Sequence, residues 1–185
     1  MKQKYLKGEI AYGGEPLQSL WAYKKYGVQG DSIVAFQGPC EVTVEALVDV
    51  EDALAGAFIY SQSMLHFIVE HFDQDLEAAI LRQYLLVCSA QDLLNRSQKK
   101  VRVVRDGNDL YAGKAKMSVS IATLTPVSSK IHFGINVVSE GTPVKTLGLK
   151  DLRLDPRTFA DALLKGYVAD HLRRRVARSK VRGVA

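Results

Sequence analysis

The stretch from Asp106 to Val138, DGNDLYAGKAKMSVSIATLTPVSSKIHFGINVV, decides the fold class. Residues alternate in polarity from 116 to 124 and again from 131 to 137, which is typical of strands that bury one face. The intervening segment 125–129, TPVSS, is short and rich in turn-forming residues. The pattern therefore predicts two adjacent antiparallel strands, 116–124 and 130–138, joined as a hairpin.

Each strand of this hairpin has one apolar face, formed by Met117, Val119, Ile121 and Thr123 in the first strand and by Ile131, Phe133, Ile135 and Val137 in the second. If the two apolar faces pack together in the core, the other faces meet on the opposite side. We expect that side to be a polar floor beneath the Asn108–Asp109 loop, composed of Lys116, Ser118, Ser120, Gly134 and Asn136. The alternative is an ordinary half-exposed sheet with a solvated polar face.

The same stretch resembles the central segment of biotin protein ligases. It reads N-D-L at 108–110, then Gly113 and Lys116, then G-I-N-V at 134–137, in the order of the ligase pattern. Lipoate ligases have a similar N-D pair and a lysine followed by a strand of small residues. Over most of its length, including 48–52 (VDVED), 64–67 (MLHF) and 141–144 (GTPV), the chain also resembles the conserved family called domain of unknown function 366. The fold of that family is thought to be similar to biotin and lipoate ligases.

The resemblance implies an α+β fold with a mixed, largely antiparallel sheet, as in class II synthetase-like ligases, and a site for a small carboxylic acid such as biotin, lipoate or octanoate. Lys116 would contact the carboxylate and the acyl-phosphate, because a fixed ammonium stabilises the negative charge that develops there. The Asn108–Asp109 pair would lie by the nucleotide and its metal. Without the resemblance, a lysine at the start of a strand is usually a solvated surface residue. The implied ligand-binding residues are Asn108, Asp109, Gly113, Ser118, Ser120, Gly134 and Asn136, with Lys116 catalytic.

Two phosphate-binding features of those ligases have no counterpart in the sequence. Biotin ligases carry a basic glycine-rich segment before this region, and lipoate ligases carry an arginine pair followed by three glycines. The nearest glycine-bearing stretches here, 12–15 (YGGE) and 37–41 (QGPCE), are also ordinary turn sequences. ATP and magnesium therefore stay open as cofactors.

Three functions remain open, and the sequence does not decide whether the protein is an enzyme. They are an ATP-dependent acid ligase, an acyltransferase that takes a preformed thioester, and a catalytically silent protein that binds the acid or its acyl derivative. Cys40, which follows Gly38-Pro39 in what looks like an exposed turn, is the candidate nucleophile of the acyltransferase, together with Lys116. The expected partners are the small acid or acyl derivative and an acceptor protein, with a homodimer left open.

No metal site is predicted from the sequence. His66 and Glu70 are four residues apart on an expected helix while His71 points elsewhere, which favours a surface pair over a metal. The acidic residues 49, 51 and 52 could supply two carboxylates to magnesium, or could decorate the N-terminus of a helix.

Composition and charge limit the other function classes. A chain of 185 residues with 47% apolar content suits one core, so we expect a single domain over 1–185. Residues 165–185 carry seven basic side chains and one acidic, which accounts for the net charge of +5 and predicts a basic C-terminal tail at 173–185. Such a tail is usually a solvated helix end, so nucleic acid is not expected as a partner. The longest uncharged apolar run, 53–60, is far below the ~20 residues that span a bilayer, so we expect a cytoplasmic protein.

The remaining elements are read from hydrophobic spacing. The spacing predicts helices at 16–26, 61–72, 76–82 and 91–95 and a final helix that begins at Asp155-Pro156 and buries a stripe running to Leu172. It predicts further strands at 32–36, 42–50 and 83–88 and one that begins at Val101 and turns at 106–108. Strands joined by hairpins with helices packed on them favour a mixed or antiparallel sheet over a doubly wound one.

Overall fold

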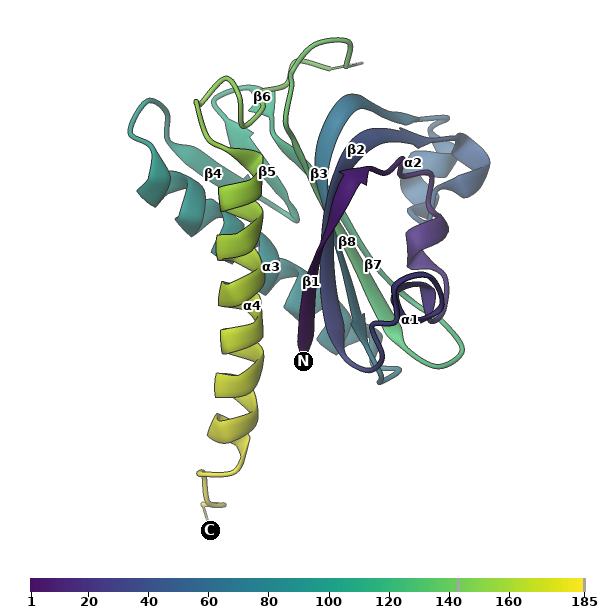
Figure 1. Cartoon of the computed structure of the whole chain (residues 1–185), viewed down its shortest axis with the longest axis vertical. Helices are drawn as coiled ribbons and strands as arrows, with labels where there is room; N and C mark the ends of the chain where they lie inside the picture. Colours follow the sequence, from purple (N-terminus) through teal and green to yellow (C-terminus); the bar gives the residue numbers. More distant parts are fainter. Residues whose placement is uncertain (143, 185) are drawn as a thin grey trace.

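The computed structural model describes residues 1–142 and 144–184, and its centre is a five-stranded sheet (Figure 1). The strand order is β1-β2-β3-β8-β7. The bounds are β1 (Lys2–Glu9), β2 (Ser32–Val42), β3 (Ile59–His71), β7 (Ser118–Leu124) and β8 (Ser129–Asn136). β1 pairs with β2 in parallel and the other pairs are antiparallel, so the predicted mixed, largely antiparallel sheet is confirmed.

Helices cover both faces of this sheet. The long helices α3 (Leu76–Ser97) and α4 (Pro156–Arg178) pack on one face, and α1 (Trp21–Tyr26) and α2 (Val50–Leu54) lie on the other side (Figure 1). Two short 3-10 turns, η1 (Glu15–Leu17) and η2 (Val44–Ala46), precede α1 and α2. A small sheet of β4 (Val103–Asp106), β5 (Asp109–Ala112) and β6 (Ala115–Lys116) lies beside β7. In the described part of the chain, no helix has the length and apolar character needed to cross a membrane.

Each face of the central sheet has its own hydrophobic cluster. Leu65, Phe67 and Phe133 point toward α3 and α4, whereas Phe36 and Ile68 point toward α1. As a consequence β3 is buried on both faces over most of its length. A strand of this kind has no polar face, so its sequence shows no alternation.

This double burial explains why the predicted helix at 61–72 is wrong. Met64, Leu65, Ile68 and Val69 are spaced as on one side of a helix, but they alternate between the two faces of β3. The predicted strand at 83–88 is also wrong, and so is the division into separate helices at 76–82 and 91–95. All three segments belong to α3, whose N-terminus is capped by Asp75 through the Ala78 amide.

Two further predicted elements differ from the structure. The predicted strand at 42–50 is wrong, because β2 ends at Val42 and the chain then turns into η2 and α2. The helix predicted at 16–26 is divided between η1 and α1 by Leu20, whose φ of 63° is incompatible with a continuous helix.

The final helix begins where the sequence predicts. The Asp155 carboxylate accepts a hydrogen bond from the Thr158 amide, and Pro156 occupies the first turn. The buried stripe ends at His171, so the prediction that Leu172 faces inward is wrong. The helix continues to Arg178 and includes the first part of the expected basic tail.

The predicted hairpin is present as β7 and β8, but the predicted polar floor is wrong. Ser118 is opposite Ile135 and Val119 is opposite Gly134. Because opposed residues share a face, Ser118 lies on the helix-covered side, while Val119 lies on the same side as Gly134. The two strands therefore do not bring their apolar faces together. The alternation is interrupted at Met117, where the chain passes from the small sheet into the large one and its carbonyl accepts the Asn136 amide.

Candidate functional site

A cleft of about 460 Å³ lies on the sheet face opposite α3 and α4. Its floor comes from the central strands and includes Met64, Val119, Ile121, His132 and Asn136. One wall is the Asn108–Asp109 loop with Lys116, and the other is the segment that contains η2, α2 and the start of β3. Just over half of the lining residues are apolar, and the polar ones include Asp49 and Asp52 of the second wall as well as Lys116 and Asp109 of the first.

Six of the eight ligand-site residues implied by the resemblance line this cleft: Asn108, Asp109, Lys116, Ser118, Ser120 and Asn136. Ser118 and Ser120 do so from the edge strand β7, although they are paired with Ile135 and Phe133 of the helix-covered face. Gly113 and Gly134 do not contribute to the lining. Gly113 is at the turn between β5 and β6, with a φ of 60°. Gly134 lies in β8, and a Cβ there would be too close to the Met64 sulfur, so its absence of a side chain makes room for Met64.

Lys116 is held in the wall of the cleft by an ion pair. Its Nζ lies 2.6 Å from Oδ2 of Asp109, and both side chains are partly shielded from solvent. Burial opposes the charged form of Lys116, but the Asp109 carboxylate outweighs burial and raises the pKa of the ammonium. Burial raises the pKa of Asp109, and Lys116 offsets only part of this effect. Lys116 is therefore a fixed cation whose partner is an incompletely satisfied carboxylate, since the buried Oδ1 of Asp109 has no hydrogen bond to any part of the chain that the structure describes.

The Asn108, Ser118 and Ser120 side chains hold the loop onto β7. Asn108 Nδ2 donates to the Ser120 carbonyl, and Ser120 Oγ donates to the Asn108 carbonyl, each at 2.8 Å. Ser118 Oγ accepts the Leu110 amide at 2.9 Å. These bonds keep the loop at a fixed distance from the floor. Asn136 differs, because its buried Oδ1 has no hydrogen-bond partner in the described structure and the residue lines the cleft.

A buried histidine pair, which sequence reasoning missed, forms part of the floor. His66 Nε2 lies 3.3 Å from the Gly38 carbonyl, which can only accept, so this nitrogen carries the proton. His66 Nδ1 then accepts from His132 Nε2 at 3.1 Å. Burial lowers the pKa of His66 to about 3 and that of His132 well below its ordinary value, so both rings are neutral. Because Nε2 of His132 carries the proton of this neutral ring, its Nδ1 has a free lone pair at the cleft floor.

The aromatic ring of Tyr12 packs over this histidine pair. Its ring stacks on the His132 ring with centroids 3.8 Å apart and an interplanar angle of 17°. The one available sequence signal for His132 is its position in β8, two residues from Gly134 in the ligase-like segment. Tyr12 gives no signal, because the contact joins residues 120 positions apart.

Three sequence interpretations need correction. Cys40 is not in an exposed turn: it is fully buried in β2, and burial raises the pKa of its thiol to about 12, the opposite of what a nucleophilic thiolate requires. Glu70 is not the partner of His66, because its carboxylate pairs with buried Lys130 at 3.2 Å. Asp49 is the N-cap of α2, accepting the amides of the two acidic residues near it, as the helix-terminus interpretation expected.

The comparisons with known proteins agree with this architecture. An uncharacterized protein of Methanocaldococcus jannaschii, MJ0805, is 43% identical over 154 residues. The match covers 80% of this chain and 69% of the length of MJ0805. A protein of unknown function from Pyrococcus horikoshi has a solved structure with a TM-score of 0.94 and 37% identity, with each chain covered completely.

Two solved ligases share the fold at low sequence identity. Biotin protein ligase from Aquifex aeolicus, in complex with biotin and ATP, has a TM-score of 0.60 at 16% identity, covering 94% of this chain and 71% of that one. Protein Ta0514 from T. acidophilum, assigned as a lipoate protein ligase and solved with bound lipoic acid, has a TM-score of 0.54 at 13% identity, covering 90% and 84%. The fold is therefore that of biotin and lipoate ligases. Residues 1–182 match the profile described as "Domain of unknown function (DUF366)", and the chain belongs to that family.

Proposed function

We propose that the protein binds a small carboxylic acid, or its acyl derivative, in the cleft, with the acid group at Lys116. One observation carries this proposal: among the described residues that line the cleft, Lys116 is the only lysine or arginine, and just over half of the lining residues are apolar. A ligand that suits this arrangement has one anionic end and an apolar body. The volume of about 460 Å³ is within the range of small-molecule sites.

The ion pair with Asp109 determines how many N–H donors of the Lys116 ammonium are available to a ligand. An ammonium has three donors, and the Asp109 carboxylate uses part of this capacity, so a ligand carboxylate would take the remaining N–H groups. The free Oδ1 of Asn136 and the lone pair of His132 Nδ1 add acceptors on the floor. They favour a ligand that also carries an N–H or O–H donor.

After binding of the acid, the fold similarity supports a second step, in which ATP activates the bound acid. Asp49, Asp52 and Asp109 all line the cleft, so a nucleotide would enter a site with three carboxylates. Phosphates and carboxylates repel each other unless a divalent cation bridges them, so any nucleotide would bind as its magnesium complex. The buried thiol of Cys40 does not support a thioester route through that residue.

A ligand screen tests the proposal. Thermal unfolding with biotin, lipoate and octanoate, each with and without magnesium and ATP, should show a rise in melting temperature with at least one acid, because a ligand that binds only the folded state stabilises it. Lys116→Ala should weaken binding of that acid roughly tenfold or more, the size expected for a lost charge-assisted hydrogen bond, whereas Lys114→Ala should not. Equal affinity of Lys116→Ala and the unmutated protein would refute the assignment. Pyrophosphate exchange with ATP would separate a ligase from a binding protein.

A further inference from the structure

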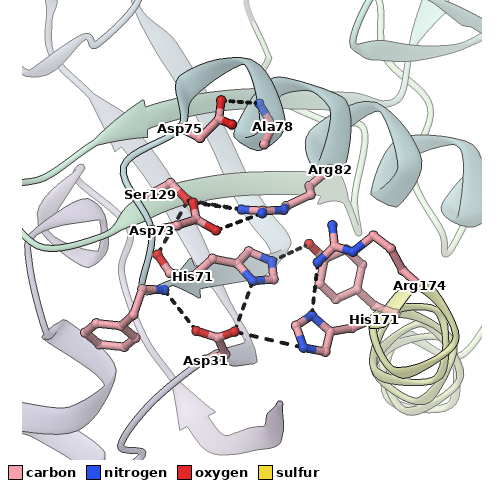
Figure 2. Close-up of polar contacts among 11 residues, drawn as sticks. Asp31, His71, Asp73, Asp75, Ala78, Arg82, Ser129, His171 and Arg174 are labelled. Carbon is pink, nitrogen blue, oxygen red and sulfur yellow. Dashed lines mark hydrogen bonds and ion pairs between the residues drawn. The ribbon is translucent and has the colours of Figure 1, made fainter. Parts of the chain in front are cut away.

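A second polar cluster lies at the other end of the central sheet (Figure 2). Asp31 precedes β2, His71 ends β3, and His171 comes from α4. Asp31 Oδ2 is 3.6 Å from Nδ1 of His71 and 3.9 Å from Nε2 of His171. We propose that these three atoms form a binding site for a divalent transition-metal ion, with Zn²⁺ as the ion that suits them best.

The spacing of the three atoms fits such an ion. Zn²⁺ bonds to imidazole nitrogen and carboxylate oxygen are about 2.0–2.2 Å, so neighbouring ligands of a tetrahedral ion are about 3.4 Å apart. The three ligand atoms lie within 4.8 Å of one another, so bonding geometry requires the Asp31 contacts to contract by a few tenths of an ångström and the two histidine nitrogens to approach each other by at most about 1.4 Å. Two nitrogens and one oxygen leave the fourth position to water.

His171 provides an independent sign of a missing partner. Its side chain is only 5% exposed, and among the described residues its buried Nε2 has no hydrogen-bond partner although it faces the Asp31 carboxylate. A buried polar atom without a partner costs free energy, and a metal ion would satisfy it. Burial lowers the pKa of His171 to about 4 and also lowers that of His71, so both rings are neutral and able to ligate at neutral pH.

The surroundings orient two of the three ligands. The Phe72 amide donates to Oδ1 of Asp31 at 2.9 Å, which turns Oδ2 toward the histidines. His71 Nε2 lies 3.0 Å from the Tyr167 hydroxyl, so that nitrogen can donate its proton there while Nδ1 faces the ion. Hydrogen bonds of this kind to the far atoms of metal ligands fix their tautomer and direction.

Arg174 opposes binding in the present arrangement. Its guanidinium lies 3.3 Å from His171 Nδ1, and because a guanidinium can only donate, this nitrogen must accept. The ring proton is then on Nε2, the atom that the ion requires. The ion can bind once the Arg174 side chain swings away, which lets the proton move to Nδ1. Two other cations are nearby: Arg82, which is already engaged by Asp73 at 2.7 Å, and the N-terminal ammonium, which also lowers the pKa of His171.

The site is separate from the cleft. His71 and Met64 of the cleft floor are seven residues apart on β3, or about 23 Å at 3.3 Å per residue. A bound ion would tie together the segment before β2, the end of β3 and the last third of α4. Its role would be to fasten α4 to the sheet, whatever the cleft binds.

Zn²⁺ titration of the chelator-treated full chain, with a competing chromophoric chelator, tests this site. We expect one equivalent of Zn²⁺ to bind and to raise the melting temperature. Asp31→Asn and His171→Gln should weaken binding at least about tenfold, whereas Asp170→Asn, which changes an acidic neighbour outside the cluster, should not. Arg174→Met should tighten binding, because it removes the donor that keeps the proton on Nε2.

The Arg174 variant keeps the test decisive if a ligand variant fails to fold. Its side chain is outside the buried stripe of α4, so it should fold as the unmutated protein does. Failure of the unmutated protein to bind stoichiometric Zn²⁺ would overturn the proposal. Unchanged or weaker binding by Arg174→Met would overturn coordination through His171 Nε2, and unchanged binding by folded Asp31→Asn would do the same for the carboxylate.

Discussion

Lys116 and Asp109 depend on each other for stability as well as for any ligand. Replacing Lys116 by alanine would leave the Asp109 carboxylate without a cation in a place where burial already raises its pKa. We expect Lys116→Ala to lower the free energy of unfolding by roughly 1–3 kcal/mol. Lys114→Ala, at an exposed position two residues earlier, should change it little. Urea unfolding at pH 7.5 measures both variants.

Two treatments should reduce the deficit of Lys116→Ala. Adding Asp109→Asn removes the unpaired charge, so the double variant should recover at least half of the lost stability. Lowering the pH should also help, because a carboxyl with a raised folded pKa takes up a proton more readily in the folded state and so favours folding as the pH falls. A deficit that responds to neither treatment would show that Lys116 contributes through packing alone.

Gly134 is required by space rather than by backbone conformation. A Cβ at this position would lie too close to the Met64 sulfur and 3.2 Å from His132 Nε2. We expect Gly134→Ala to cost about 1–3 kcal/mol, typical of overpacking. Adding Met64→Ala to that variant should recover part of the loss, since the nearest atom belongs to the Met64 side chain. Thermal or urea unfolding of the single and double variants checks this, and independent, additive losses would contradict it.

The sequence could predict the residues of the loop wall and Asn136 of the floor, but not the histidine pair or Tyr12. Lys116, Asp109 and Asn108 follow one another along a hairpin and a recognisable segment, so their proximity is local. His66, His132 and Tyr12 come from three distant segments, and their contact depends on the order of strands in the sheet. Single-sequence periodicity contains no information of that kind.

At the scale of elements, sequence and structure differ most where burial is most complete. β3 and β8 are central strands covered on both sides, and the apolar spacing of β3 predicts a helix that is not there. β8 is predictable as a strand because His132, Gly134 and Asn136 interrupt its apolar residues. The register of β7 against β8 could not be inferred, because it depends on where the chain leaves the small sheet at Met117.

The end of α4 should be dispensable for folding. Buried residues of this helix end at His171, and Val176 is exposed. Deleting residues 177–185 should therefore leave cooperative unfolding intact, with a loss below about 1 kcal/mol. Deleting residues 167–185 also removes Tyr167 and His171 and should prevent stable folding. Circular dichroism during thermal unfolding distinguishes the two truncations. Loss of cooperativity in the shorter deletion would show that the basic end is structural.

Across the whole molecule, all four histidines are buried and should make the fold sensitive to acid. Burial lowers the pKa of every one of them, to about 3 for His66 and to about 4 for His171. The unfolded chain, with an ordinary pKa of about 6.5, therefore binds more protons than the folded protein below that pH. The stability that neutral histidines contribute is complete above pH 6.5 and is lost as the pH falls toward the folded values.

The resulting slope can be measured. Each histidine that is charged only in the unfolded state contributes about 1.4 kcal/mol per pH unit, so the free energy of unfolding should fall progressively more steeply between pH 6.5 and 5. Proton uptake on unfolding, measured at pH 5.5 without metal, should exceed about two protons, since most of the four rings are charged in the unfolded chain at that pH. If Zn²⁺ binds His71 and His171, it should raise the free energy of unfolding without reducing the slope of that free energy against pH, because a bound ion keeps both rings unprotonated in the folded state. A free energy of unfolding that stays constant between pH 7.5 and 5 would show that water reaches the histidines and that they titrate in the folded protein.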